Sequence, residues 1–314
     1  MSYLESAAAS VQSRSRIRSH IYETPLLPAR SKTNLFFKAE NFQLTGSFKL
    51  RGAMSKMSAS TSSARLITAS SGNHGIGAAC AARKLGRDLT VVLPETVVPA
   101  KLAKIRQYGV NVILHGAETG LAEQHAQKLA QEEGYTYVSP YNDPDIIAGQ
   151  GTIGLEILEQ CPNVDNVFIA MGGGGLISGI GSVLKAFSPK VKVYGASANN
   201  SRALAASMAA GKVVETEHLS TLAEAVAGGI DEETITLPLA MKVVDKVLDC
   251  DEDDIKEALK VLVLEENMLM EGSSALALAG FKKMEENVQG QVNVVVLCGA
   301  NFDRDSIVRE VFGR

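Results

Sequence analysis

Short apolar runs alternate along the chain with longer stretches in which apolar residues recur at helical spacing. Runs rich in Val, Ile and Leu that end at turn residues are typical of strands, and their alternation with helical stretches predicts an α/β protein with largely parallel sheets. The predicted strands cover residues 35–38, 66–69, 89–93, 110–114, 135–138, 167–171, 191–194 and 292–297.

Two of these runs, 167–171 and 292–297, are almost wholly apolar, as strands covered by helices on both faces are. Both end in turns that contain glycine, and open parallel sheets bind ligands beyond the carboxyl ends of their strands. The βαβ pattern predicts a small domain at residues 65–141, with residues 1–64 and 142–314 forming a large domain. A cleft between two such lobes is a favoured place for a small molecule.

Composition narrows the class of protein. The 314 residues are 46% hydrophobic, which is enough for one large or two medium domains. The 31 basic and 35 acidic residues form no basic block, so we expect no nucleic-acid partner. No apolar stretch has the length of a signal peptide core or a membrane span, so we expect a cytoplasmic protein without membrane contact. The 4 cysteines are far apart, which predicts neither a zinc site nor a disulfide framework.

The residues that could bind a ligand or take part in a reaction follow the predicted strands. Lys49 follows the first strand and is flanked by glycines; taken alone, it is better explained as a solvated helix residue. Residues 70–75 read Ser-Ser-Gly-Asn-His-Gly between a strand and an Ala-rich helix. Such a junction directs unpaired backbone N–H groups at one point, which suits a carboxylate or a phosphate, although Ser and Asn are also ordinary helix caps.

Four glycines, residues 172–175, follow a buried strand and precede a helical run; we call them the tetraglycine turn. Glycines let the backbone approach an anion closely, so this turn predicts a phosphate cradle. A nicotinamide-dependent dehydrogenase is disfavoured, because Ile177 occupies the place of the third glycine of a dinucleotide fingerprint. The next strand ends in Ser197 instead of an acid that would bind a ribose.

The last strand ends in Cys298-Gly-Ala-Asn301, which alone is an ordinary strand end with a buried thiol. Together the clusters provide an amine for a Schiff base, a carboxylate pocket, a phosphate cradle and a small polar partner. A pyridoxal 5'-phosphate (PLP) enzyme requires that set.

The order of these motifs resembles the fold-type II PLP-dependent enzymes, most closely the serine/threonine dehydratase (ammonia-lyase) and serine racemase branch. The resemblance extends from Thr24 to the C-terminus. Its most specific parts are residues 46–53 (Gly-Ser-Phe-Lys-Leu-Arg-Gly-Ala), 70–75, 148–152 (Ala-Gly-Gln-Gly-Thr) and the tetraglycine turn. It implies a two-lobed, tryptophan-synthase-β-like fold with open, largely parallel sheets, the cofactor in the interlobe cleft, and a homodimer.

The resemblance also implies residue roles. Lys49 is expected to bind PLP covalently and to remove the substrate α-proton, and Ser71 is the candidate acid/base on the opposite face. Cofactor contacts are expected from Phe48, Lys49, Asn73, Gly172, Gly173, Gly174, Gly175, Leu176 and Cys298. Substrate carboxylate contacts are expected from Ser70, Ser71, Gly72 and His74.

The implied reaction converts a small β-hydroxy amino acid, of the L-threonine or L-serine type, to a 2-oxo acid and ammonia. Racemisation of serine stays open because of Ser71, and hydroxyaspartate stays open as a substrate, although no basic residue is clearly placed for a second carboxylate. A non-catalytic member of the fold is disfavoured by the presence of Lys49, Ser71 and Asn73.

Two features depart from the branch or leave a choice open. Many members carry a divalent cation held by acids after the tetraglycine turn, but here the strand reads Gly195-Ala196-Ser197, so we expect no metal. Glu271 lies in a turn that resembles one where the family's acid helps to organise the cofactor pocket, and capping of the following helix is an equally good explanation.

Overall fold

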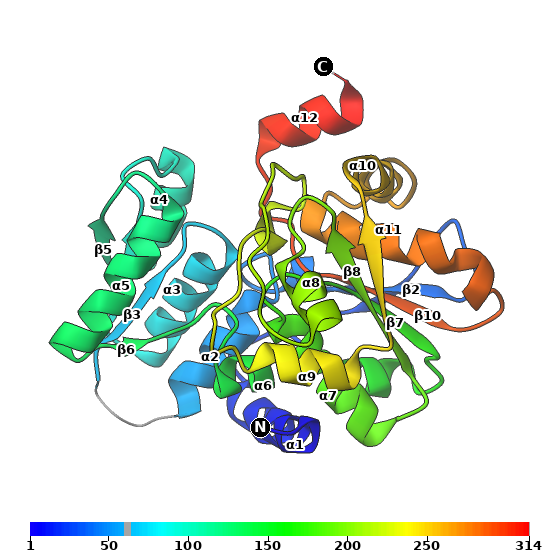
Figure 1. Ribbon diagram of the computed structural model, residues 1–314, viewed down its shortest axis with the longest axis horizontal. Helices are drawn as coiled ribbons and strands as arrows, with labels where there is room; N and C mark the ends of the chain where they lie inside the picture. The colour runs from blue at the N-terminus through cyan, green and yellow to red at the C-terminus, as the bar shows by residue number, and fades with distance from the viewer. Residues whose placement is uncertain (60–63, 314) are drawn as a thin grey trace.

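The computed structural model describes residues 1–59 and 64–313 and contains two sheets with helices on both faces (Figure 1). This arrangement confirms the predicted α/β class with largely parallel sheets. The larger sheet has the strand order β1-β2-β10-β7-β8-β9, and the smaller sheet has the order β5-β4-β3-β6. The domain boundaries at residues 65 and 141 stay a prediction.

In the larger sheet every neighbouring pair is parallel except β1 and β2, which pair antiparallel. Its strands are β1 (Leu26–Pro28), β2 (Leu35–Ala39), β7 (Asn166–Ala170), β8 (Lys192–Ala198), β9 (Lys246–Cys250) and β10 (Asn293–Leu297). The smaller sheet is parallel throughout, and its strands are β3 (Leu66–Ala69), β4 (Leu89–Leu93), β5 (Asn111–Leu114) and β6 (Thr136–Tyr137).

The helices of the first half are α1 (Tyr3–Ile17), α2 (Lys49–Ala59), α3 (Asn73–Leu85), α4 (Pro99–Arg106), α5 (Thr119–Glu133) and α6 (Pro144–Gln160). Those of the second half are α7 (Gly175–Phe187), α8 (Ala203–Ala210), α9 (Thr236–Val243), α10 (Glu252–Lys260), α11 (Gly272–Met284) and α12 (Arg304–Phe312).

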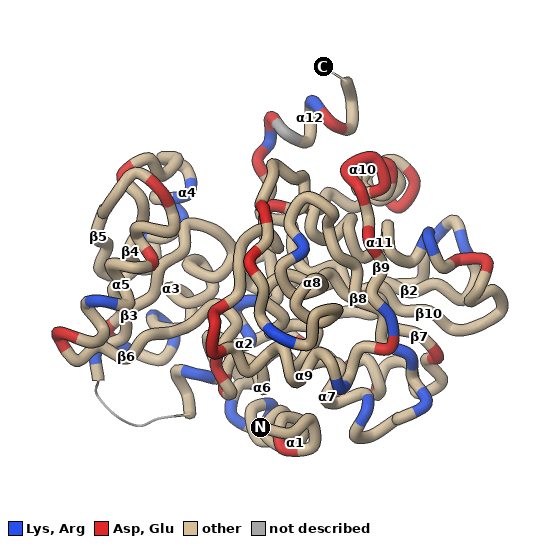
Figure 2. Tube along the Cα trace, in the orientation of Figure 1, with Lys and Arg blue, Asp and Glu red and all other residues tan. Residues whose placement is uncertain are grey.

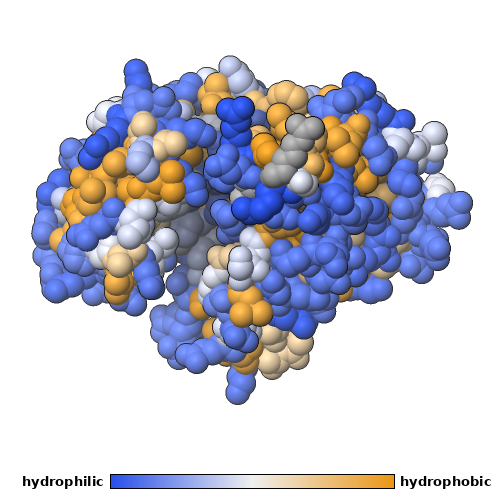
Figure 3. Space-filling model, turned by 90° about the horizontal axis from the view of Figure 1, so that it is seen from above, coloured by the Kyte–Doolittle hydropathy of each residue, from blue (hydrophilic) through white to orange (hydrophobic). Residues whose placement is uncertain are grey.

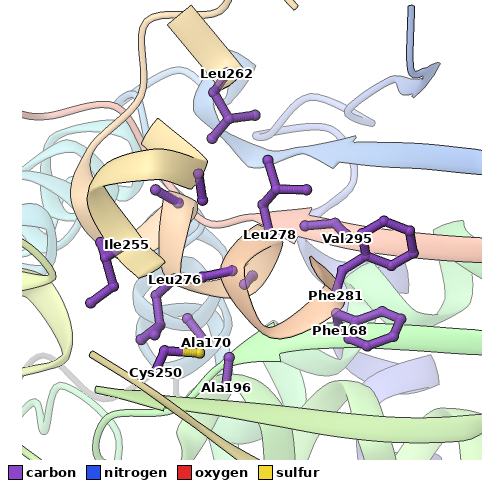
Figure 4. Packing of buried hydrophobic residues seen from close by; sticks show 14 of the residues in the cluster. Phe168, Ala170, Ala196, Cys250, Ile255, Leu262, Leu276, Leu278, Phe281 and Val295 are labelled. Carbon is purple, nitrogen blue, oxygen red and sulfur yellow. The ribbon is translucent and has the colours of Figure 1, made fainter. Parts of the chain in front are cut away.

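The larger sheet is buried on both faces, and its side chains alternate between two cores. On β10, Val295 and Leu297 join the core beneath α11, whereas Val294 and Val296 join the core beneath α6 and α7. Figure 4 shows the first of these cores, where Phe281 of α11 lies against Phe168 of β7. The rings of these two residues meet edge to face at 5.3 Å. The period of two explains why these strands are continuous apolar runs in the sequence.

All eight strands predicted from apolar runs are present, with shifts of one to four residues at some ends. Two edge strands, β1 and β9, were not predicted. β1 has only three residues and ends in proline, and β9 places Lys246 and Asp249 on its exposed positions. Among the described residues, no helix is long and apolar enough to cross a membrane.

Candidate active site

A cavity of about 690 Å³ lies where the smaller sheet and its helices meet the larger one. Seen from the side of α12, the surface is hollowed between these two parts (Figure 3). The walls of the cavity include the residue 70–75 turn, which follows β3 of the smaller sheet. On the side of the larger sheet they include residues from the segment 220–227 and Glu271. Lys49 and Phe48 line it and also line a smaller cavity that reaches the tetraglycine turn. The four sequence clusters therefore meet at one place.

Lys49 is the first residue of α2 and is only partly exposed. Its Nζ donates a hydrogen bond of 2.7 Å to the carbonyl oxygen of Pro140 and lies 5.3 Å from the centre of the Phe48 ring. Burial lowers the pKa of Lys49 to about 8, although the charge of the Glu271 carboxylate opposes the shift. At pH 7 about a tenth of this amine is therefore unprotonated and able to act as a nucleophile or base, far more than for a lysine with the ordinary pKa of 10.5.

Arg51 of α2 has a fully buried side chain, which anchors the helix. The guanidinium donates to Glu40 through Nε at 2.8 Å and to Glu156 of α6 through Nη2 at 2.8 Å. Burial opposes the charge of Arg51, but Glu40 and Glu156 outweigh it and raise the Arg51 pKa. Lys38 completes the cluster by donating to Glu156 at 2.6 Å. These bonds fix the start of α2, and thus Lys49, relative to β2 and α6.

The tetraglycine turn is so closely packed that it has no room for side chains. A Cβ at Gly173 would lie 2.5 Å from the ring of Tyr141, and one at Gly172 would lie 2.9 Å from Val226. Gly174 has a φ of 89°, in the left-handed region that favours glycine. Helix α7 begins at Gly175 without a side-chain cap, so its first N–H groups remain available to an anion.

The residue 70–75 turn joins β3 to α3 and is equally crowded. A Cβ at Gly75 would lie 1.9 Å from the carbonyl oxygen of Ser70, so glycine is needed there for the close approach. The Ser70 hydroxyl accepts a hydrogen bond of 3.2 Å from the N–H of Gly72. Helix α3 has no side-chain cap and no acid in its first turn, so Ser70, Ser71, Gly72 and the helix start present donors to the cavity.

Asn73 is buried and belongs to a polar network with Glu271 and Asn301. Its Nδ2 donates to both carboxylate oxygens of Glu271, at 2.9 and 3.0 Å. Its Oδ1 accepts from Nδ2 of Asn301 at 2.7 Å, and the Asn301 backbone N–H donates to Glu271 at 3.1 Å. Glu271 has no side-chain bond to the start of α11. It therefore organises the pocket and does not cap the helix.

Cys298 is buried at the end of β10, with Sγ 3.6 Å from Oγ of Ser274 and 3.7 Å from Oε1 of Glu271. Burial and the nearby Glu271 carboxylate raise the pKa of the Cys298 thiol far above its usual range. The group at this position is thus a neutral thiol at every physiological pH.

His74 is buried on the first turn of α3, with Nε2 3.1 Å from the carbonyl oxygen of Val138. Because a carbonyl only accepts, the hydrogen-bond network places the ring proton on Nε2. Burial and the Lys49 charge lower the pKa of His74 to about 3, so the ring is neutral. A neutral ring whose Nδ1 carries no proton does not suit a carboxylate. The predicted contact between His74 and the substrate carboxylate stays a prediction, and the backbone N–H of His74 suits it better than the ring does.

Comparison with known proteins identifies the family. The model of the family described as "Pyridoxal-phosphate dependent enzyme" matches residues 17–299. The chain belongs to this family. It is 34% identical over 306 residues to the catabolic L-threonine dehydratase TdcB of Escherichia coli (strain K12), covering 93% of this chain and 92% of that protein.

Solved structures of this PLP-dependent family agree. The processed form of threonine deaminase isoform 2 from Solanum lycopersicum superposes with a TM-score of 0.93 at 30% identity, covering 99% of this chain and 92% of that one. Maize serine racemase superposes with a TM-score of 0.88 at 28% identity, covering 98% and 97%. The fold is therefore the predicted fold-type II architecture, and the protein is a PLP-dependent enzyme.

The residues present fit this cofactor. The tetraglycine turn has no room for side chains and ends at uncapped N–H groups, as a phosphate cradle requires. The partly buried Lys49 amine lies on the wall shared by this turn and the larger cavity. We found no comparable cluster for a metal: in the described ranges, no three His, Cys, Asp or Glu side chains are grouped to hold one.

Sequence reasoning missed three contributors to the site. Pro140 contacts Lys49 through a backbone carbonyl, for which a sequence carries no side-chain signal. Tyr141 packs against the tetraglycine turn, and its hydroxyl accepts a hydrogen bond of 2.7 Å from the N–H of Asp231. Asn301 was noted only as part of a strand end, although its place just after a candidate cofactor residue was a usable signal.

Proposed function

We propose that this enzyme is a PLP-dependent ammonia-lyase that converts L-threonine or L-serine to the corresponding 2-oxo acid and ammonia. One observation carries the proposal: the Lys49 amine, with its pKa lowered to about 8, lines a cavity together with the donors of the residue 70–75 turn. Such an amine can take an α-proton at neutral pH. The dehydratase and deaminase relatives support the same reaction class.

The roles of the protein groups follow from their chemistry. The hydroxyls of Ser70 and Ser71 and the backbone N–H groups of Ser70, Ser71 and Gly72 bind the substrate carboxylate and orient the substrate's Cα–H bond toward Lys49. The N–H groups of the tetraglycine turn and Leu176 bind the cofactor phosphate. Bound PLP supplies an electron sink for the negative charge at Cα. Nζ of Lys49 would accept the α-proton, and with a proton the β-hydroxyl would leave as water. The released enamino acid would then add water and lose ammonia, which gives the 2-oxo acid.

Cys298 supports elimination over other outcomes. A neutral thiol beside the cofactor ring does not stabilise a protonated ring nitrogen as a carboxylate would, so less negative charge is drawn from Cα into the ring. Charge retained at Cα favours prompt loss of the β-substituent.

Charge along the cavity supports a substrate without a second carboxylate. Acidic side chains in its wall are Glu123, Glu224, Glu252, Asp253, Glu271, Asp303 and Glu310. Its basic side chains are Lys49, Lys101, Lys256 and Arg309, and the last two pair with Glu310 at 3.1 and 2.7 Å. Acids also gather on α10, beside this wall (Figure 2). An acidic wall repels the extra carboxylate of hydroxyaspartate.

The test is formation of 2-oxo acid and ammonia by purified enzyme from L-threonine, L-serine and threo-3-hydroxyaspartate. We expect turnover of the first two, little of the third, and loss of all turnover in Lys49→Ala. The control is Lys104→Ala, which removes an exposed lysine of α4. An enzyme that turns over none of these substrates would contradict the proposal.

Racemisation of serine is the second candidate, and the presence of Ser71 in the same cavity as Lys49 favours it. The similarity to maize serine racemase supports keeping it. The ratio of D-serine to pyruvate formed from L-serine separates the two reactions. A ratio well above one that falls in Ser71→Ala would make racemisation the main activity.

The cytoplasmic location and the homodimer are further proposals. All four cysteines are free, as in proteins of reducing compartments. Exposed apolar residues Leu4 and Val11 of α1 and Met241 of α9 support a subunit contact, and these two helices touch. Cell fractionation and light scattering after gel filtration test the location and the dimer.

A further inference from the structure

Asn301 lies at a junction of three segments that form the cavity wall. Its side-chain Nδ2 donates to the carbonyl oxygen of Thr45 at 2.8 Å and to Oδ1 of Asn73 at 2.7 Å. Its backbone N–H donates to Glu271 at 3.1 Å. One residue therefore ties the chain that leads into Lys49 to the start of α3 and to the turn before α11.

The surroundings leave Asn301 little freedom. Ala300 donates its N–H to the carbonyl oxygen of Gly46 at 2.9 Å, and Ser47 pairs with Gly299 across an isolated bridge. A Cβ on Gly46 would lie 3.1 Å from the Asn301 carboxamide. The backbone after β10 is thus held against the segment before Lys49, and the Asn301 side chain has one direction in which to point.

These bonds decide how the Asn73 carboxamide is turned. An amide oxygen only accepts and an amide nitrogen only donates, so Nδ2 of Asn301 requires Oδ1 of Asn73 to face it. The Glu271 carboxylate, which only accepts, requires Nδ2 of Asn73 on the other side. Asn301 and Glu271 together exclude the flipped rotamer. The two oxygens of one carboxylate lie too close together to face both N–H groups of Nδ2, so they share one of them. The other N–H is left for a ligand in the cavity, which Asn73 lines.

We infer that Asn301 is a positioning residue that holds the Asn73 carboxamide with its donor toward the cofactor. The inference rests on a contact between Asn73 and the phenolic oxygen of PLP, which the family resemblance implies for the expected cofactor contact of Asn73, and it does not depend on which amino acid is the substrate. A hydrogen bond to that oxygen stabilises its anionic form. It therefore lowers the pH at which the lysine–cofactor linkage loses its proton.

The experiment measures that pH by titrating the visible absorbance of the holoenzyme without substrate. Asn73→Ala removes the donor and should raise the midpoint by about one pH unit, the size expected of a single hydrogen bond. Asn301→Asp places acceptors against Oδ1 of Asn73 and the carbonyl oxygen of Thr45, so it favours the flipped amide. It should raise the midpoint by a similar amount.

A double-mutant cycle separates positioning from a general structural effect. If Asn301 acts through Asn73, the Asn73→Ala/Asn301→Asp double variant should titrate as Asn73→Ala does. Asn301→Ala is the second variant, because it removes the donor without adding charge. Melting of the cofactor-free proteins and their affinity for PLP report any loss of folding.

The inference is overturned if both Asn301 variants bind PLP and have the wild-type pH midpoint while Asn73→Ala has a shifted one. It is also overturned if the midpoint shifts of Asn73→Ala and Asn301→Asp add in the double variant. A wild-type protein with no visible absorbance after incubation with PLP would instead contradict the proposed site as a whole. A wild type that titrates as expected but does not turn over threonine or serine would leave the role of Asn301 intact and contradict only the proposed reaction.

Discussion

Lys38 and Lys49 are close together in the chain, but their surroundings give the first a structural role and the second a chemical one. Lys38 of β2 is fully buried and donates to Glu156 at 2.6 Å, to the carbonyl oxygen of Thr24 at 2.7 Å and to Gln160 at 2.9 Å. Lys49 has one bond, to the carbonyl oxygen of Pro140, and no carboxylate within ion-pair distance in the described part of the chain. The first amine is committed to the fold, and the second is available to a reactant.

Burial lowers the pKa of both lysines, but it is opposed differently. At Lys38 the charges of Glu156 and Glu40, and the hydrogen bond that Lys38 donates to Glu156, counteract the burial. At Lys49 the Glu271 carboxylate, which lies beyond ion-pair distance, opposes burial less effectively, and the pKa falls to about 8. A lysine without an ion-pair partner is costly to bury as a cation, so the fold keeps Lys49 poised to lose its proton.

The largest effect should come from Lys49→Ala. Removing the base should reduce 2-oxo acid formation by about 10²–10⁴-fold, which is the contribution of a positioned proton transfer. The melting temperature of the cofactor-free protein should change little, since the amine makes one hydrogen bond. If Lys49→Ala kept its turnover, or if the cofactor-free variant were unfolded, the distinction between a structural Lys38 and a chemical Lys49 would be wrong.

Lys38→Met should have the converse effect. It leaves the Glu40, Arg51 and Glu156 cluster with one uncompensated negative charge in the interior. We expect a loss of roughly 3 kcal/mol in the free energy of unfolding, measured in urea, with unchanged turnover per folded molecule. The added substitution Glu156→Gln should recover part of the loss, and a wild-type stability for Lys38→Met would contradict the account.

The pH dependence of cofactor capture sharpens the comparison. The rate at which cofactor-free enzyme takes up PLP should rise with pH around a midpoint near pH 8, well below the pKa of 10.5 of an ordinary lysine. The free energy of unfolding should also depend on pH. The unfolded chain binds the Lys49 proton more tightly than the folded chain does, so the contribution of Lys49 to stability rises between pH 8 and 10.5. A capture midpoint near 10 would show that burial does not depress the Lys49 pKa.

The smallest effect is expected from Cys298→Ser. The hydroxyl is neutral, as the buried thiol is, so the charge beside the cofactor ring does not change. Turnover should stay within about 10-fold of wild type, because only a weak hydrogen bond is altered. A much larger loss, with the cofactor still bound, would mean that the thiol has a role beyond its neutrality.

The sequence predicted the interior strands because β7 and β10 are apolar on both faces, and it located the site because glycines and Lys49 occur at strand ends. It did not predict β1 and β9, whose edge positions tolerate polar residues and proline. It also gave no access to contacts that depend on the folded backbone. The carbonyl of Pro140, the ring of Tyr141 against Gly173 and the Asn73–Asn301 bond join residues far apart in the chain.

The most direct test of the division between the two lysines is borohydride reduction of the holoenzyme followed by peptide mapping with mass spectrometry. The account predicts one reduced cofactor adduct, on the peptide that contains Lys49, and none on the peptide that contains Lys38. An adduct on Lys38 or on any other lysine with Lys49 unmodified, or no adduct at all, would contradict it.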